Sequence, residues 1–168
     1  AADNSNGPNR GNLYIVYTAQ PSLTDNADIF FIRSTNYGTN WSLPKKVNDD
    51  LTNTDQWMPA ISVDNNTGKI FISWYDSRVD PVYNLQTKLY GTVSLDGGLS
   101  FADNAAISTI SFNPLNSATY GYMGHYIGIS AIGNTSYAAW NDGRNNNFGS
   151  YTGYYPDFAM TANPGTLN

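Results

Sequence analysis

The sequence predicts an all-β protein built from antiparallel, four-stranded units, and three observations support this. Segments in which apolar and polar residues alternate recur along the chain, and they are rich in β-branched and aromatic residues. A turn motif of the form Ser-x-(Asp/Asn)-x-Gly-x-x-aromatic occurs twice, starting at Ser34 and at Ser94. No segment shows the periodicity of an amphipathic helix. A chain of 168 residues is most simply one domain.

The first unit, residues 1–48, is predicted to be partial. Residues 13–19 alternate, follow a Gly/Pro/Asn turn signal and are expected to form a strand. A polar loop over residues 20–27 leads to a second strand at 28–33, and residues 45–47 form a short edge strand. Residues 1–4 resemble the end of a preceding strand and its turn.

The second unit, residues 49–110, is predicted to be complete. Four antiparallel strands are expected at residues 57–63, 69–76, 88–93 and 106–110. Four strands in about sixty residues is the size of one blade of a β-propeller.

The third unit, residues 111–168, is again predicted to be partial, with strands at 126–131, 136–142 and 154–160. The turn motif does not recur there. A second internal match fixes the register independently, because Trp-x-Asp-x-Arg occurs at residues 74–78 and again at 140–144.

The turn motif has a structural explanation. The Asx side chain accepts hydrogen bonds from backbone N–H groups ahead of it, the glycine adopts a positive φ, and the aromatic residue folds back onto the core. The structural positions are Ser34, Asn36, Gly38 and Trp41 in the first copy and Ser94, Asp96, Gly98 and Phe101 in the second.

This motif resembles the Asp-box, or BNR repeat, of the sialidase (neuraminidase) superfamily, and the resemblance covers about residues 12–160. It implies secreted, four-stranded blades of a six-bladed β-propeller, of which this chain holds about three. The box lies on the face away from the active site in that family. Because both outer units are partial, we expect the remaining blades on a longer chain or on a self-associating partner.

Composition excludes some partners. The net charge is −5, charged residues make up 12% of the chain, and the only adjacent cations are Lys45 and Lys46, which argues against a nucleic-acid surface. No apolar run is long enough to span a membrane, and no signal peptide is present in this chain. A neutral-polar, aromatic-rich composition favours an extracellular bacterial protein that handles carbohydrate.

The sequence assigns no catalytic residue. The resemblance implies an arginine triad, an Asp acid/base and a Tyr nucleophile activated by Glu. All 13 acidic residues are Asp, so the Tyr/Glu pair cannot be assembled from this chain unless an aspartate substitutes or another segment provides it.

A ligand-binding rim is predicted where the loops from each outer strand to the next inner strand meet the loops between second and third strands. Its candidates are Asp55, Gln56, Arg78, Tyr122, His125, Tyr126 and Arg144. The two arginines repeat with the architecture, which favours structural pairs with Asp76 and Asp142 over carboxylate binding. His125, at the position of Gln56, is interpreted as a hydrogen-bonded structural or ligand-contact residue rather than a catalytic one.

No cofactor is predicted. Asp49, Asp50 and Asp55, or residues 76–80, offer oxygen ligands for Ca²⁺ but lack the spacing of a calcium loop. Three functions remain open: a non-catalytic module binding a glycan or an extracellular protein, part of a glycoside hydrolase whose catalytic residues lie largely elsewhere, and a subunit that assembles through open sheet edges.

Overall fold

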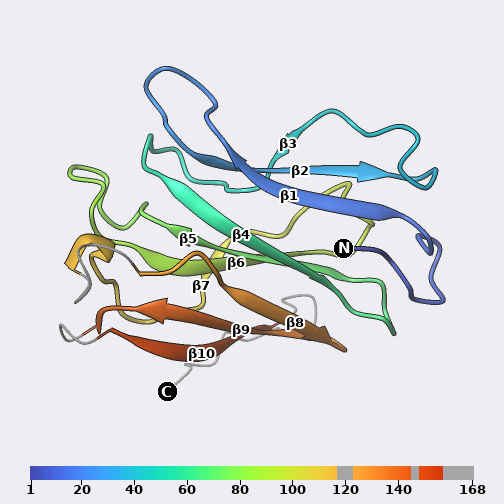
Figure 1. Cartoon of the computed structure of the whole chain (residues 1–168). Coiled ribbons are helices and arrows are strands. Elements are labelled where there is room, and N and C mark those ends of the chain that lie inside the picture. The colour runs from blue at the N-terminus through green and yellow to red at the C-terminus, as the bar shows by residue number, and fades with distance from the viewer. Residues whose placement is uncertain (117–122, 145–147, 157–168) are drawn as a thin grey trace.

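The computed structural model describes residues 1–116, 123–144 and 148–156, and these form three antiparallel sheets stacked in chain order (Figure 1). The first sheet contains β1 (Leu13–Ala19), β2 (Asp28–Ser34) and β3 (Lys45–Lys46). The residues before it add to its edge, since the Tyr14 N–H donates to the Ala1 carbonyl at 2.9 Å. This confirms that residues 1–4 begin at the end of an inner strand.

The second sheet has the strand order β4-β5-β6-β7. Its strands are β4 (Gln56–Val63), β5 (Ile70–Asp76), β6 (Lys88–Ser94) and β7 (Ala105–Ala106). All seven residues of β5 are buried, because sheets cover both of its faces. The first three predicted strands are present near their predicted bounds, whereas the fourth, predicted at 106–110, is only the two-residue β7 and overlaps the prediction at Ala106 alone.

The third sheet contains β8 (Gly128–Ile132), β9 (Thr135–Asp142) and β10 (Gly149–Pro156). The prediction for β10 was wrong at its start, because the strand begins at Gly149 rather than at Tyr154. The missed residues, Gly-Ser-Tyr-Thr-Gly, have a turn-like composition but pair with β9 along its whole length. Predicted strand residues 157–160 lie outside the described part.

Apolar side chains fill both spaces between the sheets. Tyr14 and Phe31 of the first sheet pack against Ile72 and Trp74 of the second. Other aromatic and aliphatic side chains join the second sheet to the third, among them Tyr75, Leu89, Phe112 and Trp140. Each sheet thus buries its second strand against a neighbour, as stacked sheets require.

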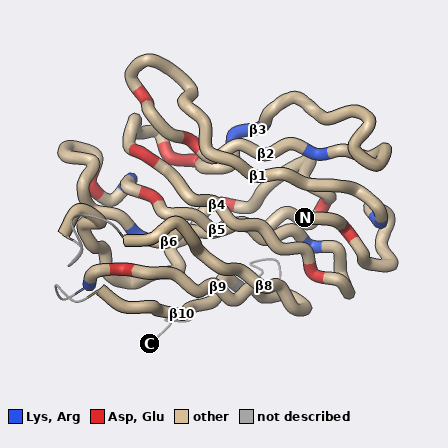
Figure 2. Tube along the Cα trace, viewed as in Figure 1, with Lys and Arg blue, Asp and Glu red and all other residues tan. Residues whose placement is uncertain are grey.

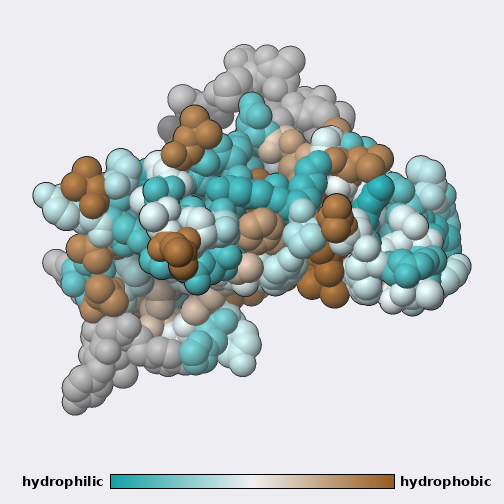
Figure 3. Space-filling view, turned by 90° about the horizontal axis from the view of Figure 1, so that it is seen from above, coloured by the Kyte–Doolittle hydropathy of each residue, from teal (hydrophilic) through white to brown (hydrophobic). Residues whose placement is uncertain are grey.

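The first sheet has a second apolar face. Ile15 pairs with Ile32, and Tyr17 stacks on Phe30 with ring centroids 6.0 Å apart. No sheet among the described residues covers this face, and Ile15 is 43% exposed. Seen from above, this side of the molecule shows separate apolar groups among polar ones rather than one continuous patch (Figure 3).

The loops divide between two ends of the stack (Figure 1). At one end, which we call the loop rim, lie loops 20–27, 48–56 and 77–87 and the described residues 123–127 that lead into β8. The Gln56 N–H donates to the Ala27 carbonyl at 2.8 Å, and the Ser77 N–H donates to the Asp55 carbonyl at 3.0 Å. The opposite end, the turn rim, carries both copies of the turn motif, as the sequence predicts.

Candidate functional site

The two copies of the turn motif have the same hydrogen-bond geometry. In the first copy, Ser34 Oγ accepts from the Gly38 N–H at 2.8 Å, and Asn36 Oδ1 accepts from the Asn40 N–H at 2.9 Å. Gly38 has a φ of +86°, which only glycine adopts readily.

The second copy repeats these contacts one for one. Ser94 Oγ accepts from the Gly98 N–H at 2.8 Å, and Asp96 Oδ1 accepts from the Ser100 N–H at 2.9 Å. Gly98 has a φ of +84°. The serine and Asx side chains thus bond only within their own turn, which is the geometry of a folding device. The Gly97 and Leu99 carbonyls of the second turn also accept from Arg33 Nη1 at 3.0 Å and from Lys45 Nζ, which ties this turn to the first sheet.

The motif's aromatic residues differ between the copies. Phe101 packs edge-on against Phe31 of the first sheet, with ring centroids 5.1 Å apart, which confirms the predicted return to the core. Trp41 is 37% exposed, so the same prediction was wrong for the first copy. The reason is positional: Phe101 rests on the sheet before its own, and no described sheet precedes that of Trp41.

The Trp-x-Asp-x-Arg match forms a buried cluster at the loop rim. Asp76 is fully buried, and its Oδ2 accepts from Trp74 Nε1 at 2.9 Å and from Arg78 Nε at 3.0 Å. The Arg78 backbone N–H donates to Asp76 Oδ1 at 2.9 Å. One carboxylate therefore ends β5, orients the indole and holds the guanidinium.

The third sheet repeats this cluster. Asp142 is fully buried, and its Oδ2 accepts from Trp140 Nε1 at 2.8 Å. Arg144 donates from Nε to Asp142 Oδ1 at 2.8 Å, and its guanidinium lies 3.9 Å from the Tyr151 ring centroid. The hydrogen bonds to Asp142 raise the pKa of Arg144. The predicted pairs of Arg78 and Arg144 with these carboxylates are confirmed.

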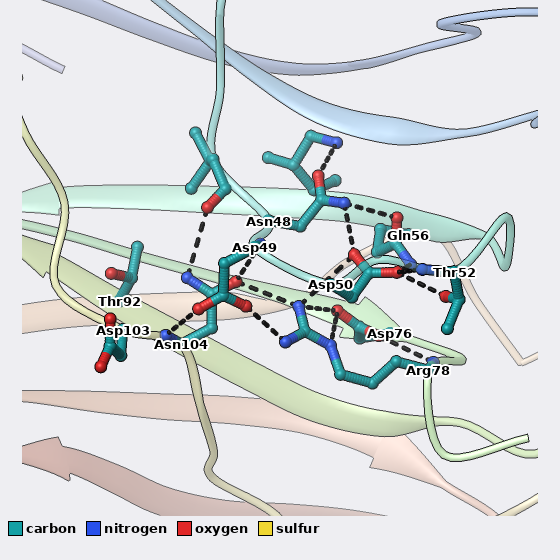
Figure 4. Close-up of polar contacts among 12 residues, drawn as sticks. Asn48, Asp49, Asp50, Thr52, Gln56, Asp76, Arg78, Thr92, Asp103 and Asn104 are labelled. Atoms are coloured by element: carbon teal, nitrogen blue, oxygen red, sulfur yellow. Dashed lines mark hydrogen bonds and ion pairs between the residues drawn. The ribbon is translucent and has the colours of Figure 1, made fainter. Parts of the chain in front are cut away.

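Arg78 also joins β5 to the connection between β3 and β4 and to the segment before β7 (Figure 4). Its Nη1 donates to Asp49 Oδ1 at 2.6 Å, and its Nη2 donates to Asp76 Oδ2 at 2.8 Å and to Asn104 Oδ1 at 3.0 Å. Its guanidinium lies 4.5 Å from the Tyr90 ring centroid. Burial alone would lower the pKa of Arg78, but the hydrogen bonds and charge of Asp76 outweigh it and raise that pKa.

The geometry leaves Arg78 little capacity for a ligand. A guanidinium has five N–H donors, and bidentate recognition of a carboxylate needs two that point the same way. Asp49, Asp76 and Asn104 take four of the Arg78 donors. Its arrangement is that of a clamp that holds the β3–β4 connection against the second sheet.

A second polar cluster surrounds Asn48 (Figure 4). Asn48 Nδ2 lies 2.6 Å from Asp28 Oδ1, 2.7 Å from Asp50 Oδ1 and 2.8 Å from Gln56 Oε1. Three acceptor oxygens thus converge on an amide with two hydrogens. Asp28 is buried and also pairs with Lys46 Nζ at 2.7 Å, which compensates its charge.

Asp25, on the loop between β1 and β2, is another buried carboxyl at this rim, with only 5% of its surface exposed. Burial raises the pKa of Asp25, and the negative charge of Asp28 raises it further. The Ala27 N–H donates to Asp25 Oδ1 at 3.3 Å, a long bond that offsets little of this effect. Carboxyls with a raised pKa are typical of proton-transferring sites, although ion networks produce them too.

The structure separates the remaining predicted rim residues. Gln56 is fully buried and donates to the Thr54 carbonyl at 2.7 Å, so it positions its neighbours and does not face solvent. Asp55 is half-buried, and its Oδ1 is buried without a hydrogen-bond partner.

His125 and Tyr126 are exposed, with edge-to-face rings 6.4 Å apart, and Tyr126 is 86% exposed. The predicted equivalence of His125 with the buried Gln56 therefore does not extend to their surroundings. The β8 ladder ends at Gly128, so His125 lies outside the sheet. Tyr122 lies outside the described residues.

Most of the carboxylates considered for Ca²⁺ accept hydrogen bonds from within the protein, among them Asp49, Asp50, Asp76 and Asp80. Asp80 accepts from the Tyr83, Leu85 and Gln86 N–H groups at 3.1–3.2 Å, which orders loop 77–87. Burial acts against it, but these bonds lower the pKa of Asp80. Within the described ranges, no group of three or more His, Cys, Asp or Glu side chains could hold a metal ion.

Sequence reasoning missed Asp25, Asp28, Asn48 and Asn104. Asp28 and Asn48 stand at a strand start and directly after a strand end, which marks them as rim positions. Asn104 carries no such signal, because its contact with Arg78 links residues 26 positions apart. In the described part of the chain, no helix is long and apolar enough to cross a membrane.

No protein-family model matches the sequence, and no curated protein sequence matches it. Solved structures of glycoside hydrolases with β-propeller folds do match the structure. The α-L-arabinanase of Penicillium chrysogenum, in complex with arabinobiose, is 17% identical with a TM-score of 0.61 over 89% of this chain and 44% of that chain.

Two sialidases match as well. The Hadza microbial sialidase Hz136 is 18% identical with a TM-score of 0.55, over 89% of this chain and 34% of that chain. The intramolecular trans-sialidase of Ruminococcus gnavus, in complex with oseltamivir carboxylate, is 11% identical with a TM-score of 0.52, over 93% of this chain and 33% of that chain. The chain thus shares the all-β fold of these proteins and spans less than half of their length.

Proposed function

We propose that this chain is a segment of an extracellular β-propeller of the BNR type that binds glycan at its loop rim and is not itself catalytic. The observation that carries the proposal is the composition of that rim, where ordered amide and carboxylate groups stand beside exposed aromatic rings. Tyr126 is 86% exposed and Tyr83 is 75% exposed. Tyrosine faces stack on sugar rings, and fixed polar groups orient sugar hydroxyls.

The fold supports the same reading. The arabinanase structure holds arabinobiose, so a related propeller fold binds a short neutral glycan. In this proposal the three sheets are blades, the turn motifs are Asp-boxes, and further blades come from a longer chain or from association with another copy. The exposed second face of the first sheet is consistent with a missing neighbour.

Isothermal titration calorimetry of the purified chain against arabinobiose, longer arabinan oligosaccharides and lactose tests the proposal. Tyr126→Ala is expected to weaken binding about two- to tenfold, because one aromatic contact contributes about 0.5–1.5 kcal/mol. Tyr37→Ala is the matched control, since Tyr37 is 84% exposed on the turn rim and should leave binding unchanged. Equal losses in both variants, or no binding by the parent, would contradict the proposal.

A second candidate function is part of a glycoside hydrolase. One observation favours it specifically: burial and Asp28 raise the pKa of Asp25, as a general acid requires. Hydrolysis of aryl arabinosides and aryl sialosides by the parent chain, with loss of activity in Asp25→Asn, would establish this function. A parent chain that binds sugar without cleaving it would exclude it for these residues alone.

A further inference from the structure

Carboxylates outnumber cations at the loop rim, and Figure 2 shows acidic positions along this end of the molecule. Eight described aspartates lie in or directly beside its loops: Asp25, Asp28, Asp49, Asp50, Asp55, Asp76, Asp80 and Asp142. Four cationic residues lie there: Lys46, Arg78, Lys88 and Arg144. The rim is therefore negative at neutral pH.

Three of the four cations are already engaged with these aspartates. Lys46 pairs with buried Asp28 at 2.7 Å, Arg78 pairs with buried Asp76 at 2.8 Å, and Arg144 pairs with buried Asp142. Freeing any of these three for a ligand would leave a buried carboxylate uncompensated, which is costly.

Arg78 gives the sharpest case. Its side chain is 16% exposed, and Asp49 and Asp76 hold it within 2.6 and 2.8 Å. Asp50 Oδ1 also lies near the guanidinium, at 3.7 Å from Arg78 Nη2. Three carboxylates surround one guanidinium, so the net charge of this group is negative where an anionic ligand would have to approach.

We infer that the loop rim accepts glycans without negative charge and rejects sialylated or other anionic glycans. This inference rests on the proposed function and names the ligand class of the same site. The inferred ligand of this chain is therefore not a sialic acid, although the fold resembles that of sialidases. Juxtaposed like charges disfavour such a ligand, and salt screens that repulsion over a Debye length of about 10 Å at 0.1 M.

Calorimetric titration of matched sugar pairs tests the inference. The pairs are lactose with 3′-sialyllactose, and a xylo-oligosaccharide with its glucuronic acid-substituted form, each measured in 20 mM and 200 mM NaCl. The expected result is about tenfold weaker binding of the anionic member at low salt, with a smaller difference at high salt.

Each outcome decides between the two ideas. Equal or tighter binding of the anionic member overturns the inference and leaves glycan binding standing. A difference that does not shrink with salt also overturns it, because the discrimination would then be steric. If the chain binds no sugar of either pair and no arabinan oligosaccharide, the proposed function is overturned, and the inference falls with it.

Discussion

Replacing Arg78 by methionine separates a structural arginine from a ligand-binding one. The substitution keeps most of the aliphatic volume and removes the guanidinium that Asp76 accepts from at 2.8 and 3.0 Å. Asp76 is fully buried, and it would retain the indole of Trp74 and one backbone N–H as donors. Removing one partner of a buried ion pair costs about 3–5 kcal/mol.

We expect a loss near the lower end of that range, about 3 kcal/mol, because two hydrogen bonds to Asp76 survive and Arg78 is 16% exposed. The contact with Asp49 adds little, since that carboxylate is 44% exposed and exposed pairs contribute at most about 1 kcal/mol. Asp49→Ala should therefore cost much less than Arg78→Met.

Urea unfolding followed by far-UV circular dichroism measures both losses. Arg78→Lys is the graded variant, because lysine retains the charge but lacks the planar fork, and its loss should lie between those of the parent and Arg78→Met. A fully stable Arg78→Met variant that no longer binds sugar would refute the clamp and restore a direct binding role for this arginine.

Three further predictions concern the turn rim and the inter-sheet contacts. Gly98→Ala should destabilise the fold by about 3 kcal/mol, because the new Cβ would lie 2.4 Å from the Phe31 ring at a backbone φ of +84°. Gly133→Ala is the control, since Gly133 has a φ of +62° and no atom within 4 Å of the new Cβ, and it should cost only about 1 kcal/mol. Equal losses of unfolding free energy in urea titrations would show that backbone strain alone matters. The pKa of Asp96 is lowered in the folded protein, because hydrogen bonds from Ser100 and Ser94 outweigh the opposing effect of burial. The contribution of Asp96 to stability should therefore be complete above about pH 4, the pKa of an unfolded Asp, and be lost as the pH falls through the lower pKa of the folded state. Asp96→Asn, which copies Asn36 of the first turn, should lessen that loss, and a parent and variant with the same dependence of urea midpoint between pH 5 and pH 2.5 would contradict the assignment. Tyr75→Phe should destabilise by about 1–2 kcal/mol, because the Tyr75 hydroxyl donates to the Asn141 carbonyl at 2.7 Å and accepts from its N–H at 3.1 Å; an unchanged thermal midpoint would indicate that water replaces both contacts.

The sequence predicted most of this fold because local signals and the repeat agree. Alternating β-branched and aromatic residues mark β1 at its observed bounds, and the repeated Trp-x-Asp-x-Arg aligns β5 with β9. The prediction for β10 failed at Gly149, where glycine and small polar residues suggest a loop. Glycine fits this strand because the Trp140 ring packs against Gly153, where the Cβ of any larger residue would lie only 3.1 Å from that ring. This is a tertiary effect that local strand propensity does not contain.

The candidate site was less predictable, for a physical reason. Ion pairs between an aspartate and the arginine two residues after it are visible in the sequence, and both predicted pairs, Asp76 with Arg78 and Asp142 with Arg144, are present in the structure. Contacts between segments far apart in the sequence, such as Arg78 with Asn104 and Asp49 with the Asn104 N–H, depend on how the strands and their connections stack. The burial of Gln56 and the exposure of His125 also depend on that stacking, and a repeat alignment treats the two positions as equal.

The repeats themselves help to locate function. Residues demanded in successive sheets, such as Asp76 and Asp142, hold each sheet together and are fully buried. Under the proposed function, we expect the ligand contacts to come from loop-rim residues that differ from sheet to sheet, since a bound glycan has to distinguish one place on the rim from the others. Asp25, with its raised pKa, and the exposed pair His125 and Tyr126 are such residues. Substitutions there should change ligand affinity with little effect on stability, whereas those in the repeated clusters should do the reverse.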